Sequence, residues 1–237
     1  MWEGLRAANA ALRSARSQTT TAVQSSEQGH SGEQHHPDEQ DLELYWDPKM
    51  AEILESWGED TVWKEVQLLL VGRAGRVLDI ACGSGRAMEI LGGLPIELHG
   101  CDISELLIEK AAARGIQPSR LTVCDATRLP YEASEFDYAY SIGSLEHFTE
   151  DGIERFLAES RRVCRKASFH NIPVSRSGRN EGWISPYQSY FNNSVDWWLA
   201  KFQSACENVT VIDSTWQDDR SVGKWFVSLG SGPGSIS

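Results

Sequence analysis

The chain has 237 residues, 41% of them hydrophobic and 24% charged, which is typical of a soluble globular protein with one good-sized core. Its 34 acidic side chains exceed the 22 basic ones, and the net charge of -12 repels phosphate backbones and anionic lipid. No apolar run approaches the roughly 20 residues that a membrane span needs. The composition therefore predicts neither a membrane span nor a nucleic-acid partner.

The N-terminal segment 1–37 is polar and rich in Ser, Thr, Gln and His. Such a segment cannot bury enough apolar area to offset its ordering entropy, so we expect a flexible arm there and a flexible tail over 231–237. It lacks the apolar core of a signal peptide, and the five cysteines form no Cys-x-x-Cys pair. Both features favour a reducing, cytoplasmic compartment.

A single domain is expected over residues 38–230, beginning with a helical cap over 38–71. The first part of the cap, 38–60, has apolar residues at helical spacing and an acidic outer face. A second helix is predicted over 61–71. Its inward residues are Val62, Val66, Leu69 and Leu70.

Further along the chain, short β-like runs alternate with helical patterns. The predicted strands are 76–81, 96–101, 120–124, 136–141, 167–173, 209–215 and 224–229. The predicted helices are 86–91, 105–114, 151–165 and 195–206, and Ser104, Thr149 and Ser194 suit three of their N-caps. The alternation implies an α/β fold with a doubly wound, mostly parallel seven-stranded sheet. Because no helix separates the last two strands, they should form an antiparallel hairpin at one edge.

The strongest chemical signal is the segment Val77-Leu-Asp-Ile-Ala-Cys-Gly-Ser-Gly85. A buried strand leads through a loop with two glycines into a helix, which lets backbone N–H groups approach a ligand. A dinucleotide site requires a third glycine where Met88 stands, and no Gly-Lys-Ser/Thr follows. Asp79 precedes the glycines and suits a ligand with an ammonium group better than a pyrophosphate.

This segment and those after it resemble the class I S-adenosylmethionine-dependent methyltransferases, most closely over Val77–Phe148. The resemblance implies their Rossmann-like fold, S-adenosyl-L-methionine as cofactor and S-adenosyl-L-homocysteine as product. Ala81 stands where glycine is more usual in the family. The cofactor-binding residues that the resemblance implies are Tyr45, Asp79, Ala81, Cys82, Gly83, Asp102, Ile103, Asp125, Ala126 and Ser141.

Three of these acids have distinct roles in the family pattern. The loop after Asp79 would hold the methionine part of the cofactor. Asp102 ends the second strand and looks like the acid that accepts both ribose hydroxyls, for which two adjacent carboxylate oxygens are suited. Asp125, followed by Ala126, resembles the pair that meets the adenine. Tyr45 would close over the cofactor from the helical cap.

The methyl acceptor is narrowed by exclusion within the family. The stretch Ser141-Ile-Gly-Ser144 lacks the Asn/Asp-Pro-Pro-aromatic loop of enzymes that methylate amino groups of bases or glutamine. Tyr140 and Ser141 offer no carboxylate for magnesium, so no metal site is expected. The exclusions leave the metal-independent enzymes that methylate oxygen, nitrogen or carbon of small molecules. The resemblance of the aromatic-rich C-terminal part to members of the family favours an oxygen of a sugar, a glycan end or a secondary metabolite. A non-catalytic cofactor-binding or scaffold module is the alternative.

The substrate should be bound by segments that are added to the sheet. The segment 174–194 is predicted to be an irregular lid, because aromatic side chains on a loop suit a stacking platform, although simple packing over the sheet explains them equally well. The predicted substrate-binding residues are Glu146, Arg179, Trp183, Tyr187 and Tyr190.

His147 is predicted to be the catalytic residue. It follows the fourth strand, and an imidazole with an ordinary pKa of about 6.5 is suited to removing a proton from a hydroxyl acceptor. The alternative is a histidine that only bonds loop backbone.

Overall fold

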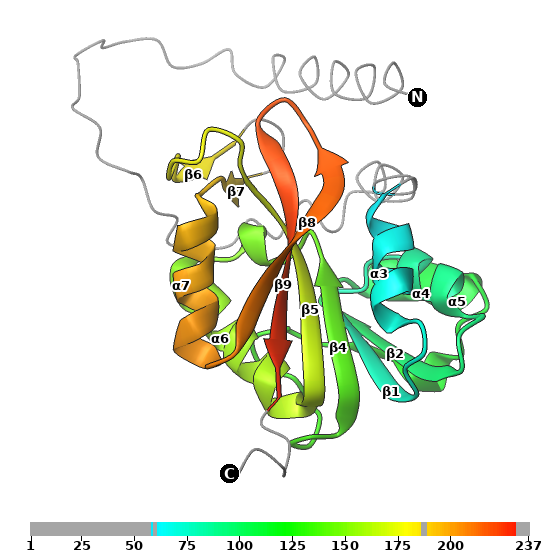
Figure 1. The fold of residues 1–237 in the computed structure, drawn as a ribbon. Helices are drawn as coiled ribbons and strands as arrows, with labels where there is room; N and C mark the ends of the chain where they lie inside the picture. Colours follow the sequence, from blue (N-terminus) through cyan, green and yellow to red (C-terminus); the bar gives the residue numbers. More distant parts are fainter. Residues whose placement is uncertain (1–57, 59–60, 186–188, 231–237) are drawn as a thin grey trace, which may run out of the picture.

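The computed structural model describes residues 58, 61–185 and 189–230. In this part of the chain seven strands form one sheet in the order β3-β2-β1-β4-β5-β9-β8 (Figure 1). Its strands are β1 (Gly75–Ile80), β2 (Ile96–Asp102), β3 (Leu121–Val123), β4 (Phe136–Ile142), β5 (Cys164–Ser175), β8 (Val209–Gln217) and β9 (Ser221–Leu229). The helices are α3 (Val62–Leu70), α4 (Arg86–Leu91), α5 (Glu105–Ala113), α6 (Glu150–Val163) and α7 (Val195–Ala205), with short 3-10 turns η2 (Pro118–Arg120) and η3 (Leu145–His147).

The strand directions confirm the predicted architecture. The five strands from β3 to β5 are mutually parallel, and β9 is antiparallel to both β5 and β8. Figure 1 shows α3, α4 and α5 on one side of the sheet and α6 and α7 on the other. The helices that connect the parallel strands therefore cover both faces, as a doubly wound sheet requires.

The predicted helix starts are confirmed at three N-caps. The side chains of Ser104, Thr149 and Ser194 each accept a hydrogen bond from the backbone N–H three residues later. One boundary was wrong: the helix predicted to reach residue 165 ends at Val163, because Cys164 already pairs with Phe136 of β4.

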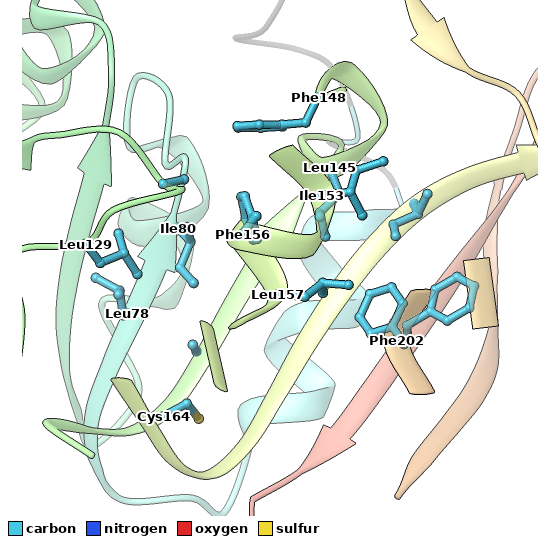
Figure 2. Packing of buried hydrophobic residues seen from close by; sticks show 14 of the residues in the cluster. Leu78, Ile80, Leu129, Leu145, Phe148, Ile153, Phe156, Leu157, Cys164 and Phe202 are labelled. Atoms are coloured by element: carbon cyan, nitrogen blue, oxygen red, sulfur yellow. The ribbon is translucent and has the colours of Figure 1, made fainter. Parts of the chain in front are cut away.

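The core has two halves, one on each face of the sheet. Between the sheet and α6 and α7 lie large apolar side chains such as Phe156 and Phe202 (Figure 2). On the other face α3 and α4 pack on β1, β4, β5 and β9. Of the predicted inward residues of α3, Val62, Val66 and Leu70 are buried and Leu69 is partly buried, whereas the equally buried Trp63 was missed.

The segment predicted as an irregular lid is partly regular. β5 extends to Ser175, and a second, two-stranded antiparallel sheet pairs β6 (Trp183–Ile184) with β7 (Tyr190–Phe191). The Trp183 ring packs edge-on against Phe191, with ring centroids 5.0 Å apart, and joins the core beside α7. For Trp183 the packing interpretation therefore holds. The helix predicted over 38–60, the arm and the tail lie outside the described residues.

A half-buried acid, Glu65, joins α3 to the far edge of the sheet. The Glu65 carboxylate accepts hydrogen bonds from Ser214 Oγ at 2.6 Å, from Thr215 N at 2.6 Å and from Trp225 Nε1 at 2.7 Å. Partial burial opposes ionisation, but these bonds outweigh it and lower the pKa of Glu65. Since Trp225 and Ser214 belong to β9 and β8, one side chain fixes α3 to the C-terminal hairpin.

Replacing Glu65 with glutamine is expected to lower the free energy of unfolding by about 2 kcal/mol, because a neutral amide is a weaker acceptor and its NH₂ faces donors. For a domain of this size that corresponds to a fall in Tm of about 4–8 °C, measurable by calorimetry. The matched change Glu109→Gln, on the exposed face of α5, should leave Tm nearly unchanged. Equal Tm values for the two variants would show that the hairpin does not depend on Glu65.

Among the residues described, no helix is both long and apolar enough to cross a membrane.

Candidate active site

A pocket of about 120 Å³ lies where the parallel strands end. Its walls come from the loop after β1, the ends of β2 and β4, the turn after β3, and α3. The predicted site residues that line it are Asp79, Ala81, Cys82, Gly83, Asp102, Ile103, Asp125, Ala126 and His147. The topology thus brings residues from four separate chain segments to one edge of the sheet, where open α/β sheets bind ligands.

The two glycines of the loop after β1 meet different needs. Gly83 has φ +54°, and a Cβ there would have no atom within 4 Å, so its lack of a side chain leaves the pocket open. Gly85 has φ +73°, and a Cβ there would lie 2.5 Å from Ile116 and 2.9 Å from Ala111. Gly85 therefore allows α4 and α5 to pack closely. Ala81 also takes a positive φ of 60°, a conformation that favours the glycine usual at this position.

The backbone N–H groups of both glycines are bonded within the protein. The N–H of Gly83 donates to Asp102 Oδ2 at 2.9 Å, and that of Gly85 donates to the Cys82 carbonyl at 3.0 Å. Neither N–H group therefore points to a ligand in this structure. Toward the pocket, the loop offers the open space beside Gly83, and Asp79 and Asp102 offer carboxylate oxygens.

Asp79 is a buried acid at the floor of the pocket. The Tyr140 hydroxyl donates to its Oδ2 at 2.7 Å. Burial raises the pKa of Asp79 well above its usual range, and the nearby Asp102 raises it further. A cationic group in the pocket would favour the ionised form of this acid.

Asp102 is held by backbone donors on both sides. Its Oδ1 accepts from Ser104 N at 2.9 Å, and its Oδ2 accepts from Gly83 N. Each carboxylate oxygen has two lone pairs, so both can accept a further hydrogen bond from a diol. Asp125 is exposed at the pocket rim, where its Oδ1 accepts from Thr127 N.

Sequence reasoning missed several residues of the pocket wall, among them Trp63 and Arg86. Trp63 of α3 lines the pocket, and the Arg86 guanidinium lies 5.7 Å from the centre of its ring. The helical pattern predicted only aliphatic residues on the inward face of α3. Trp63 could have been found because it is a large apolar side chain next to the predicted inward residue Val62.

His147 lies in η3 with one ring nitrogen fixed by backbone. Its Nδ1 is 2.8 Å from the carbonyl oxygen of Ser189. A carbonyl oxygen can only accept, so Nδ1 carries the proton and the lone pair of the neutral ring is on Nε2. Nε2 lies 3.7 Å from Glu146 Oε1. His147 thus bonds loop backbone and also lines the pocket.

Several predicted residues do not line the pocket. Ser141 points to the opposite face of the sheet, where its Oγ lies 2.8 Å from His170 Nδ1. Glu146 is buried beside the pocket wall, and Tyr190 lies next to His147, with ring centroids 6.2 Å apart. Trp183 belongs to the core, and Arg179 is exposed on a loop. Tyr45 and Tyr187 lie outside the described residues.

Two buried groups give the free energy of unfolding opposite dependences on pH. Burial lowers the pKa of His170 to about 3, where Ser141 and Ser160 contact its ring nitrogens. Between these pH values His170 is protonated in the unfolded chain but not in the folded chain. The free energy of unfolding therefore falls as pH falls from about 6.5 to 3. Burial raises the pKa of Glu146, which faces His147 and Tyr190, to about 8. Stability therefore falls as pH rises from about 4.5 to 8.

The Glu146→Gln variant is expected to lose the second dependence. As pH rises from 6.5 to 8, the free energy of unfolding of the wild type should fall by about 2 kcal/mol relative to that of the variant, which is about 1.4 kcal/mol for each pH unit. Between pH 4.5 and 6.5 the variant should show the His170 slope that Glu146 cancels in the wild type. Urea unfolding at pH 5, 6.5 and 8 measures both. Parallel curves for the two proteins would show that Glu146 is ionised in the folded state at pH 7.

The pocket fits S-adenosylmethionine by its chemistry. Three acids line it, of which Asp102 is suited to a diol and Asp79 to an ammonium group, and open space adjoins the backbone at Gly83. No group of three or more His, Cys, Asp or Glu side chains that could hold a metal occurs within the described ranges.

Comparison with known proteins agrees with this chemistry. Residues 77–167 match the family profile described as "Methyltransferase domain". The fold resembles an S-adenosylmethionine-dependent methyltransferase from Clostridium acetobutylicum, with a TM-score of 0.59 at 14% identity over 77% of this chain and 98% of that one. It also resembles the 1,6-didemethyltoxoflavin-N1-methyltransferase of Burkholderia thailandensis with bound S-adenosylhomocysteine, with a TM-score of 0.58 at 20% identity, covering 76% and 86% of the two chains. Residues 77–167 therefore carry a methyltransferase domain, and the fold around them is that of S-adenosylmethionine-dependent methyltransferases.

Curated relatives cover only part of the chain. An O-methyltransferase of Aspergillus sclerotiorum is 32% identical over 132 residues, which are 52% of this chain and 49% of that protein. The tRNA (carboxymethyluridine(34)-5-O)-methyltransferase of Saccharomyces cerevisiae is 42% identical over 91 residues, 38% of this chain and 30% of that protein. The chain thus spans about half or less of the length of these two relatives.

Proposed function

We propose that this protein transfers the methyl group of S-adenosylmethionine to an oxygen of a small molecule, such as a sugar, a glycan end or a secondary metabolite. The observation that carries the proposal is the place of His147 in the pocket wall, where its ring is oriented by the bond from Nδ1 to the Ser189 carbonyl. A hydroxyl acceptor needs a base, and an imidazole is suited to the task.

Each residue that lines the pocket would have its own part in binding and transfer. Asp102 would accept the ribose hydroxyls, Asp79 would face the ammonium group, and Asp125 and Ala126 would border the adenine. When bound, the cofactor supplies an electrophilic methyl group on a sulfonium. Because transfer is an in-line displacement, the protein contributes alignment and exclusion of water, and His147 takes the acceptor's proton.

The relatives support two classes of acceptor. The O-methyltransferases of Aspergillus sclerotiorum and Penicillium expansum favour an oxygen acceptor. The tRNA methyltransferases favour a nucleic acid, which the composition argued against. We place the small molecule first because the net charge of -12 repels tRNA and because three acids line the pocket.

Labelled S-adenosylmethionine tests the choice directly. The protein would be incubated with it and with separate pools of hydroxylated small molecules, sugars and bulk tRNA. We expect label in a small-molecule pool and none in tRNA. Label in tRNA alone would establish the second class. Calorimetry that detects binding of neither S-adenosylmethionine nor S-adenosylhomocysteine would contradict the whole proposal.

The same site argues against a non-catalytic scaffold, since Asp79, Gly83, Asp102 and His147 all line one pocket. We also propose a cytoplasmic location, because all five cysteines are free and a reducing compartment keeps them so.

A further inference from the structure

One row of residues crosses the sheet where the core gives way to the pocket. Ile142 of β4, Asn171 of β5 and Trp225 of β9 are directly paired neighbours. The preceding row on the same face, Tyr140, Phe169 and Val227, is wholly buried core under α3. Ile142 lines the pocket. Asn171 therefore sits beside the pocket wall and on the same face of the sheet.

Asn171 is an unusual residue for this place. Its side chain is 1% exposed, and neither Oδ1 nor Nδ2 has a hydrogen-bond partner. Burying an amide without partners costs free energy, and buried polar groups in native proteins are nearly always bonded. A buried amide with both ends unpartnered beside a pocket points to a ligand that supplies both bonds.

Glu146 is a second unpartnered polar group at the same edge. It is 3% exposed, and its Oε2 has no hydrogen-bond partner. The turn that leads to it is tied to β5, because the N–H of Gly143 donates to the carbonyl of Asn171 at 3.0 Å. Burial raises the pKa of Glu146 to about 8, so the acid is largely neutral at pH 7. Asn171 and Glu146 thus both offer uncharged groups that can donate and accept.

We propose that Asn171 and Glu146 form the polar part of the acceptor subsite, and that the acceptor is a neutral molecule with a hydrogen-bond donor next to an acceptor atom. A hydroxyl beside a carbonyl, or a ring lactam, has this pattern. The inference rests on the proposed function and names the substrate class of that site. An acceptor carboxylate is excluded, because the side chains paired beside Asn171 are the uncharged Ile142 and Trp225, and an unpaired buried anion is costly.

A structural corollary separates this role from simple packing. If the amide waits for a ligand, its replacement by a shape-matched apolar side chain removes an unsatisfied group. Asn171→Leu should therefore raise Tm by several degrees while it weakens acceptor binding. Replacing a residue that only stabilises the fold would not raise Tm and weaken acceptor binding at the same time.

The test uses the full chain saturated with S-adenosylhomocysteine at pH 7. The probes are three neutral fragments, salicylamide, benzamide and 2-pyridone, with salicylate as the charged counterpart of salicylamide. Ligand-observed NMR titration measures each dissociation constant. We expect at least one neutral fragment to bind, salicylate to bind about tenfold more weakly than salicylamide, and Asn171→Leu to lose about tenfold or more of the neutral binding. Ser168→Ala, on the same strand but the opposite face, should leave binding unchanged.

The proposal is overturned if no neutral fragment binds, if salicylate binds as tightly as salicylamide, or if Asn171→Leu binds the fragments normally or lowers Tm. Its failure is distinct from failure of the proposed function. S-adenosylhomocysteine affinity, measured by calorimetry in the same samples, reports on the cofactor pocket alone. Normal cofactor affinity with failed fragment binding refutes only the acceptor subsite.

Discussion

Replacement of His147 by alanine is expected to lower the turnover number by about 10²–10⁴-fold, the usual contribution of a general base. The affinity for S-adenosylmethionine should stay within about threefold, because the acids that would hold the cofactor lie on other strands. The structure sharpens the reason. Nδ1 is bonded to the Ser189 carbonyl, so in the neutral ring Nε2 is the basic nitrogen. Steady-state kinetics with an acceptor from the labelling screen, together with calorimetry, measure both quantities.

A glutamine at position 147 separates orientation from proton transfer. Its amide NH₂ can still donate to Ser189, but it has no basic nitrogen. The Gln variant should therefore be nearly as slow as the Ala variant. If it retains most of the activity, His147 orients the loop and the base lies elsewhere.

Asp102→Ala is expected to weaken S-adenosylhomocysteine binding by about 2–3 kcal/mol, roughly 30–150-fold. The ribose hydroxyls would lose their acceptors in a pocket where Asp102 is only 6% exposed. The same change also leaves the N–H groups of Gly83 and Ser104 without partners, so Tm should fall as well. Calorimetry and thermal unfolding on one preparation give both effects.

Glu105→Ala is the matched control for this change. Glu105 is an exposed acid three residues further along, in the first turn of α5, and makes no contribution to the pocket wall. The affinity of the Glu105→Ala variant for S-adenosylhomocysteine should equal that of the wild type. Unchanged affinity in Asp102→Ala would mean that the cofactor does not use this carboxylate.

Local sequence signals were sufficient for most of the fold. Ser104, Thr149 and Ser194 are short side chains whose oxygens bond the first helical turn, an interaction within a few residues that needs no tertiary partner. Alternation of strands and helices likewise limits the topology, because parallel strands require crossover connections. The prediction failed where two elements abut: β5 begins at Cys164 because β4 supplies a pairing partner that local propensity does not contain.

The sequence by itself also determined which residues meet at the ligand edge, since the ends of parallel strands converge there in every such sheet. Asp79, Asp102 and His147 lie at or after the ends of three such strands, the family resemblance assigned them to one site, and they line one pocket.

Only the tertiary structure decided which way neighbouring side chains point. Ser141 and Ile142 are adjacent in sequence, yet Ser141 bonds His170 under α6 while Ile142 lines the pocket under α3. Strand alternation makes such a choice unavoidable, but the choice itself depends on which helices cover which face. The tertiary structure was also needed to show that the buried amide of Asn171 has no hydrogen-bond partner. Whether a buried polar group is satisfied depends on all the atoms around it, and these come from three strands far apart in the chain.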